Sequence, residues 1–90
     1  MKLILEGNRI KTIEDFHGEI KSVLELPDYY GSNLDALWNC LIGWVETPVT
    51  LVWKDFGVSL TNIGDYANKA LSIFRDAEER GEGFRIECNG

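Results

Sequence analysis

Residues 27–46, PDYYGSNLDALWNCLIGWVE, combine an aromatic loop with a segment of helical periodicity. The loop occupies residues 27–31, and a helix is predicted to begin near Ser32 or Asn33 and to end before Pro48. Apolar residues recur in this helix at the spacing of a single face, which indicates that the face packs on a core. The residues of this apolar face are Leu34, Leu37, Leu41, Trp44 and Val45.

The other side of the same helix carries a row of a different kind. Trp38 borders this row, and the small residues Ala36 and Gly43 lie beside it, where another surface is able to approach closely. Because its members are spaced at four, three and four residues, they are predicted to form one exposed line. An acidic, partly apolar line beside aromatic residues is typical of a protein-binding surface. The row consists of Asp35, Asn39, Ile42 and Glu46.

Composition and charge limit the classes of function. A chain of 90 residues that is 44% hydrophobic and 27% charged is typical of a soluble globular protein, and we expect one domain over residues 1–90. Fifteen acidic and nine basic residues give a net charge of −6. This charge repels nucleic acid phosphates and anionic membranes and attracts basic proteins. We therefore expect a basic protein partner, with no direct nucleic acid binding and no membrane binding.

The N-terminus and the cysteines indicate a compartment. The apolar run Leu3–Leu5 is far shorter than the apolar region of a signal peptide, and no segment approaches the length of a membrane span. Two cysteines, Cys40 and Cys88, do not make a disulfide framework, and both are expected in the core. We expect a cytoplasmic protein that is monomeric when free.

The rest of the chain alternates between strand and helix patterns. Strands are predicted at residues 3–5, 49–53 and 84–88. Further helices are predicted from a capping box at Thr12 to Pro27, over residues 55–63, and from a cap at Asp65 to Gly81. This order predicts a two-layer α/β domain with three parallel strands joined by right-handed crossovers. Both helix pairs would then cover the same face, and water would cover the other.

The sequence gives little support for catalysis or metal binding. The single histidine, His17, is expected to be a partly exposed helix residue, because nothing pairs it with a nucleophile. Cys40 and Cys88 lack the short paired spacings of zinc sites, and no glycine-rich phosphate loop is present. Since no set of acid, base and nucleophile can be assembled, we expect neither an enzyme nor a bound cofactor or metal.

Several residues of the central stretch also have a purely structural interpretation. Asp35 follows Ser32 by three residues, so its carboxylate would be able to satisfy free backbone amides at the start of the helix. Tyr29 and Tyr30 would be able to fill the core beneath the loop, and both tryptophans of the helix would be able to pack inward. The occurrence of carboxylates, aromatics and small residues in one patch favours the binding interpretation.

The segments LPDYYG, NLDALWNCLIGWVE, WKDF and FRDA resemble the barstar family, whose members are intracellular inhibitors of barnase-type ribonucleases. The likeness is collinear over essentially the whole chain and is weakest over residues 57–64 and at the C-terminus. It implies a three-stranded parallel sheet with helices packed on it, and inhibition by occlusion of the ribonuclease active site. The surface that it implies, here called the docking face, consists of Tyr29, Asn33, Leu34, Asp35, Trp38, Asn39, Ile42, Gly43, Trp44 and Asp76.

Three positions of the docking face depart from the family pattern. Asn39 stands where the family has an aspartate that reaches deepest into the ribonuclease, Ile42 replaces a threonine, and Asp76 replaces a glutamate. Charge-assisted hydrogen bonds are about twice as strong as neutral ones, so Asn39 implies weaker binding to a barnase-like pocket. Two hypotheses follow: an inhibitor of a basic ribonuclease, or a barstar-fold interaction module whose partner is not a nuclease.

Overall fold

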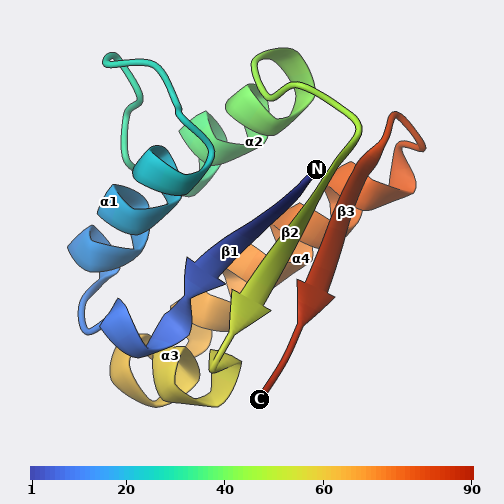
Figure 1. Ribbon diagram of the computed structural model, residues 1–90. Helices are drawn as coiled ribbons and strands as arrows, with labels where there is room; N and C mark the ends of the chain where they lie inside the picture. Colours follow the sequence, from blue (N-terminus) through green and yellow to red (C-terminus); the bar gives the residue numbers. More distant parts are fainter.

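A parallel three-stranded sheet forms one layer of the computed structural model, which describes residues 1–90 (Figure 1). The strands lie in the order β1-β2-β3, so the chain progresses across the sheet in one direction. In the register, Leu3 pairs with Leu51, and Leu51 pairs with Ile86. The strand bounds are Lys2–Glu6 for β1, Val49–Lys54 for β2 and Phe84–Cys88 for β3.

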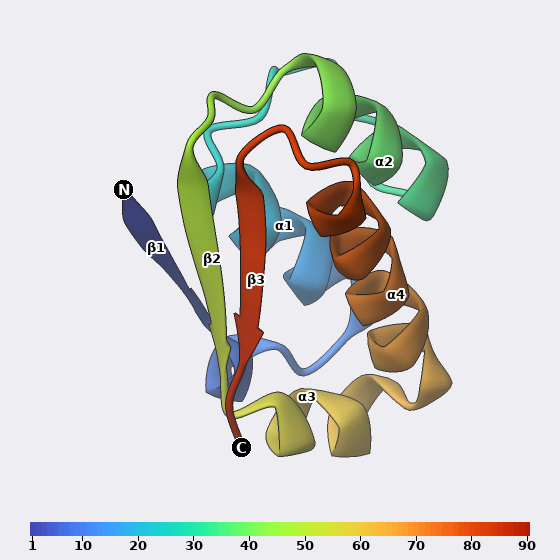
Figure 2. The same cartoon turned by 90° about the vertical axis from the view of Figure 1, so that its right-hand side faces the viewer.

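Each connection between strands contains two α-helices. A short 3₁₀ helix, η1 (Gly7–Arg9), precedes α1 (Ile13–Val23) and α2 (Leu34–Gly43), which lead from β1 to β2. The helices α3 (Phe56–Ile63) and α4 (Asp65–Glu79) lead from β2 to β3. All four α-helices lie on the same side of the sheet (Figure 2). The predicted two-layer α/β architecture is therefore confirmed. No helix has the length and apolar character needed to cross a membrane.

The strands present alternate side chains to the helix layer and to the free face. Leu51 and Trp53 of β2 are fully buried under the helices. On the free face, Lys2 Nζ lies 3.5 Å from Glu87 Oε2, and both side chains are exposed. Val52 also belongs to the free face but is only 4% exposed. Water therefore covers the polar margin of this face, while its centre is buried.

The N-termini of α1 and α4 were each predicted to have a capping residue. Thr12 Oγ1 accepts a hydrogen bond from Asp15 N (3.0 Å), and Asp15 Oδ2 accepts one from Thr12 N (3.2 Å), so the predicted capping box is confirmed. The predicted cap at Asp65 is wrong, because Gly64 occupies the N-cap position of α4. Gly64 has a φ of 65°, which glycine adopts without strain, and it also ends α3. The Asp65 carboxylate instead accepts a bond from Asn68 Nδ2 (3.3 Å).

The end of α1 differs from the prediction. The helix ends at Val23 rather than continuing to Pro27. Glu25 has a φ of 52°, in the left-handed region, and Leu26 N donates to Lys21 O (2.9 Å). This backward bond across a left-handed residue is the Schellman arrangement that ends many helices, usually with glycine at the left-handed position.

The two cysteines lie in different environments. Cys40 is buried, and burial raises the pKa of its thiol. Cys88 is exposed at the end of β3, so the prediction that it lies in the core is wrong. An edge strand has a neighbour on one side only, so its last side chain easily reaches solvent.

The outer edge of β3 carries one hydrogen bond to a helix. Ile86 N donates to Glu78 Oε2 of α4 (3.2 Å).

His17 is buried, with 2% of its surface exposed, so the prediction of a partly exposed residue is wrong. Its Nδ1 lies 2.6 Å from the Tyr30 hydroxyl and its Nε2 lies 2.6 Å from the Tyr66 hydroxyl. These two hydrogen bonds tie the aromatic loop to α1 and α4. Burial lowers the pKa of His17 and raises the pKa values of Tyr30 and Tyr66.

A second buried polar network lies where η1, β2 and α3 meet. Trp53 Nε1 donates to Ser59 Oγ (3.1 Å), and Ser59 Oγ donates to Gly7 O (3.0 Å). A Cβ on Gly7 would lie 2.1 Å from Lys54 O and 2.6 Å from Asp55 O. Because both neighbours are backbone atoms, no side chain fits at Gly7 without a shift of β2.

Substitution of two glycines should therefore have opposite effects. Gly7→Ala should lower the free energy of unfolding by about 1–3 kcal/mol or more, because the new methyl group overlaps β2. Gly18→Ala should raise it by about 0.5–1 kcal/mol, because position 18 is inside α1 with nothing within 4 Å of its Cβ. Urea unfolding of both variants beside the natural protein measures the difference. A neutral Gly7→Ala would contradict the steric account.

Acid should destabilise the protein through His17. The native pKa lies below the ordinary value of 6.5, so the unfolded chain takes up a proton first as pH falls. The free energy of unfolding should then decrease below pH 6.5, by at most about 1.4 kcal/mol per pH unit from this group. A protonated imidazole donates from both nitrogens, so the tyrosine that donates to the neutral ring would lose its acceptor.

The measurement is urea unfolding between pH 7.5 and 5.0, with His17→Gln as the control. Glutamine supplies a donor and an acceptor but does not titrate in this range. The variant should be less stable at neutral pH and should show a smaller slope with pH. Equal slopes for the two proteins would show that His17 is not the responsible group.

Candidate functional site

Asn33 fixes the start of α2. Its Oδ1 accepts a hydrogen bond from Ala36 N (2.8 Å), and its Nδ2 donates to Gly31 O (3.4 Å). Since Asn33 provides the cap, Asp35 does not form a capping box with Ser32, but it does lie in the first turn of α2, where the helix dipole favours a carboxylate. The Asp35 side chain is exposed and forms neither a hydrogen bond nor an ion pair within the chain. This carboxylate is therefore open to solvent.

The remaining residues of α2 divide by burial. Leu37, Cys40 and Leu41 are buried and join the core. Asp35, Asn39 and Gly43 are exposed. Between these two groups, three apolar residues of the docking face are half-buried: Leu34, Trp38 and Ile42. These three residues are spaced at i, i+4 and i+8, so they form a single apolar row between the exposed strip and one side of the core face of α2.

The predicted four-residue row is shorter in the structure. The helix ends at Gly43, where Trp44 N and Val45 N both donate to Cys40 O at 2.9 Å. Glu46 lies beyond this end, so its prediction as a member of the helical row is wrong. Within the helix the row keeps its other three residues, of which Ile42 is half-buried.

Trp44 does not pack inward as the helical periodicity predicted. Its side chain is 47% exposed, and its Nε1 donates to Glu25 O (3.0 Å). Trp44 is the C-cap residue of α2 and still donates from its N to Cys40 O, but at this end of the helix the indole meets the turn after α1 instead of the core. The indole ring meets the Tyr29 ring at 6.2 Å between centroids and at 84°. This edge-to-face contact is a favourable arrangement for two aromatic rings.

The two tyrosines of the loop point to different environments. Tyr30 N donates to Pro27 O (2.9 Å) in a tight turn. Tyr30 is buried and bonded to His17, whereas Tyr29 is 79% exposed. The interpretation of these residues as core side chains therefore holds for Tyr30 alone.

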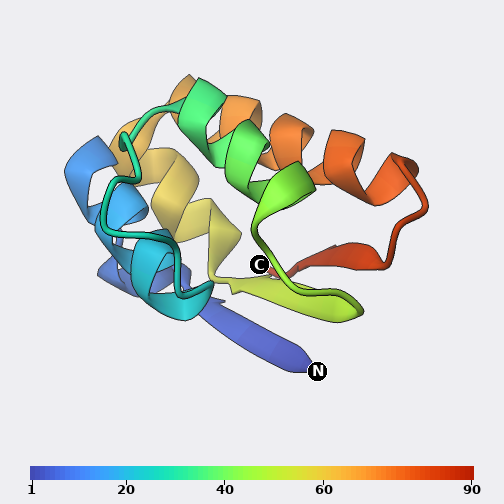
Figure 3. The same cartoon turned by 90° about the horizontal axis from the view of Figure 1, so that it is seen from above.

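Asp76 comes from a different helix. It is exposed on α4, and α4 packs against α2 (Figure 3). No hydrogen bond or ion pair connects its side chain with the rest of the docking face. Nine residues of the docking face therefore lie on the aromatic loop and on α2 with its two cap residues. The tenth, Asp76, lies on α4, which packs against α2.

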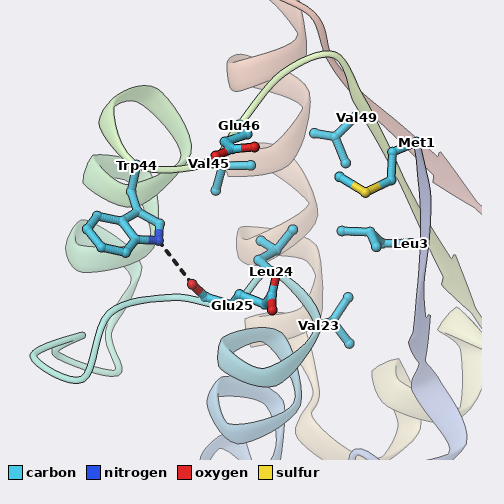
Figure 4. A pocket seen from close by; sticks show the side chains of 9 residues that line it. All are labelled: Met1, Leu3, Val23, Leu24, Glu25, Trp44, Val45, Glu46 and Val49. Atoms are coloured by element: carbon cyan, nitrogen blue, oxygen red, sulfur yellow. Dashed lines mark hydrogen bonds between the residues drawn. The ribbon is translucent and has the colours of Figure 1, made fainter.

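A pocket of about 520 Å³ opens beside Trp44 (Figure 4). Residues 23–25 at the end of α1 and residues 44–46 after α2 form part of its wall. Met1 and Leu3 at the start of the chain, together with Val49 of β2, complete it. No sequence pattern predicts this pocket, because its wall is assembled from segments that are far apart in the chain.

The side chains do not form a metal-binding group. No three His, Cys, Asp or Glu residues come together in a way that would hold a metal ion. The single histidine is bonded on both nitrogens to tyrosines, so it has no free atom to offer a substrate or a metal.

Two comparisons relate the chain to known proteins. The family model described as "Barstar (barnase inhibitor)" matches residues 1–89. A Bacillus subtilis (strain 168) protein named "Putative ribonuclease inhibitor YrdF" is 49% identical over 78 residues, which cover 87% of this chain and 86% of that protein. The three-stranded parallel sheet with four α-helices on one side agrees with the fold expected from these matches. The chain belongs to the barstar family.

Proposed function

We propose that this protein inhibits a basic ribonuclease by binding over its active site with the docking face, without chemistry of its own. Membership of the barstar family and the name of the Bacillus relative support a ribonuclease-inhibitor role. The observation that carries the proposed mechanism is the exposed, unpaired Asp35 beside half-buried Trp38 on α2. The complex would contain one copy of each protein, with residues 1–90 acting as one domain.

Charge favours a ribonuclease as the partner. An enzyme that acts on RNA holds phosphates with cationic groups, so its active site attracts an acidic protein. The chain carries a net charge of −6, and the docking face contains the carboxylates of Asp35 and Asp76 but no basic residue. Electrostatic attraction of this kind raises the association rate and weakens with salt.

Apolar residues of the docking face would supply contact area. The exposed Tyr29–Trp44 pair is held in place before binding, because Trp44 is fixed to Glu25 O. Aromatic side chains that are already ordered lose little entropy on binding and are common interface anchors. A Cβ on Gly43 would meet nothing within 4 Å, so a partner is able to approach the backbone there.

A second candidate is an interaction module whose partner is not a nuclease. The uncharged Asn39 is exposed, and the apolar Ile42 borders it on α2. These two residues stand where the family pattern has polar or charged groups, which favours a partner with a less cationic surface. Failure to inhibit guanine-preferring ribonucleases, together with capture of non-nuclease proteins alone, would support this second candidate.

Inhibition of a purified barnase-type ribonuclease tests the first candidate. The natural protein should inhibit with one-to-one stoichiometry, and the inhibition constant should increase between low and moderate salt. Asp35→Ala should raise the inhibition constant by about 10- to 100-fold, because a hydrogen bond to a charged group is worth about 1.5–3 kcal/mol.

Asp65→Ala is the matched control for Asp35→Ala. Asp65 is also an exposed aspartate in the first turn of a helix, so this variant loses the same charge at the start of α4. It should retain nearly full inhibition. Inhibition that survives Asp35→Ala and Trp38→Ala together would show that the docking face is not the inhibitory surface.

Substitution at position 39 tests the nature of the facing pocket. If the ribonuclease presents cationic groups there, Asn39→Asp should tighten binding, mainly by slowing dissociation. Surface plasmon resonance separates the association and dissociation rates of the two proteins. Unchanged or weaker binding by Asn39→Asp would show that the surface facing residue 39 is not cationic.

A further inference from the structure

We propose that the pocket beside Trp44 receives a short segment of the ribonuclease that carries a lysine or arginine side chain. This inference rests on the proposed function and extends the contact surface beyond the docking face. The stem of the basic side chain would lie on the apolar wall, and its cationic end would lie near Glu25 and Glu46.

The wall of the pocket suits an apolar stem. Seven of its nine residues are hydrophobic. Leu3 of β1 and Val49 of β2, together with Met1 just before β1, lie opposite Trp44 (Figure 4). The volume of about 520 Å³ exceeds the needs of one methylene chain and lies within the range of about 300–1,000 Å³ usual for ligand pockets. A segment of two or three residues is therefore a better fit than an isolated side chain.

The two charged side chains of the wall are both acidic. Glu25 comes from the turn after α1 and Glu46 from the segment after α2. Neither carboxylate takes part in an ion pair. The wall thus combines an apolar surface with two carboxylates that have no ion-pair partner, against one cation, the N-terminal ammonium of Met1. The remaining negative charge and the apolar surface together are the complement of a lysine or arginine side chain. A second copy of this chain, with its net charge of −6, fits less well on charge grounds.

Trp44 connects the pocket with the docking face. One side of the indole contacts Tyr29, and the Nε1 bond to Glu25 O holds the ring where it also lines the pocket. A protein that covers the Tyr29–Trp44 pair therefore reaches the mouth of the pocket without any rearrangement of the chain. This continuity places the proposed contact at the margin of the same interface.

The test compares binding kinetics of pocket variants with a barnase-type ribonuclease by surface plasmon resonance. The double variant Glu25→Gln, Glu46→Gln keeps the shape and removes both charges. Its dissociation constant should increase about 3- to 10-fold, mainly through faster dissociation, which is the range for partly exposed ion pairs. Val23→Trp should fill the space from the end of α1 and weaken binding by at least about tenfold.

A matched control removes two charges at a distance. Glu14 and Asp65 are exposed acids at the starts of α1 and α4 and do not line the pocket. The double variant Glu14→Gln, Asp65→Asn should slow association slightly and leave dissociation unchanged. Circular dichroism and thermal unfolding show whether each variant is folded. If Val23→Trp is unfolded, the comparison of the two charge variants alone tests the pocket inference.

Each outcome separates this inference from the proposed function. If the natural protein binds and Asp35→Ala weakens binding, but the glutamate double variant behaves like the control, the pocket inference is wrong and the proposed function stands. If the natural protein does not bind the ribonuclease, both fail. If sedimentation shows a dimer that Val23→Trp abolishes, the pocket belongs to a second copy of the chain, and the inference is again wrong.

Discussion

Burial of the helix-facing side of the central strand β2 is the constraint on which the rest of the structure depends. Its inward residues Val49, Leu51 and Trp53 are almost completely covered, and a parallel neighbour on each side requires a long crossover connection. Both crossovers place their helices on the same side. The side of α2 away from the core consequently becomes the outer surface of the molecule, and the candidate site lies there.

The order of strands and helices could be predicted from the sequence because each element buries one face. Burial of one face imposes a regular spacing of apolar residues on that element. The alternating strand at residues 84–88 and the capping box at Thr12 are local patterns with local causes, and both were predicted correctly. The environments of His17 and Trp44 were not. His17 is buried because tyrosines from two other segments provide hydrogen bonds to it, and no pattern around residue 17 records that.

The site shows the same division between local and distant causes. The exposure of Asp35 and Asn39 follows from their helical spacing relative to Leu37 and Leu41. The direction of Trp44 depends on where α2 ends and on a carbonyl group 19 residues earlier in the chain. Likewise, the pocket exists only after residues 1–3, 23–25, 44–46 and Val49 have met. The direction of Trp44 and the pocket both depend on contacts between segments, which no pattern within one segment records.

The bond between Ile86 N and the Glu78 carboxylate bears on how this protein behaves at high concentration. The outer edge of a sheet offers unpaired amides to any extended chain, which is a common route to aggregation. At β3 one of these amides is already occupied by an acidic side chain of the preceding helix. An incoming strand must displace this carboxylate and approach its negative charge, so the molecule carries its own protection against edge-to-edge assembly at β3.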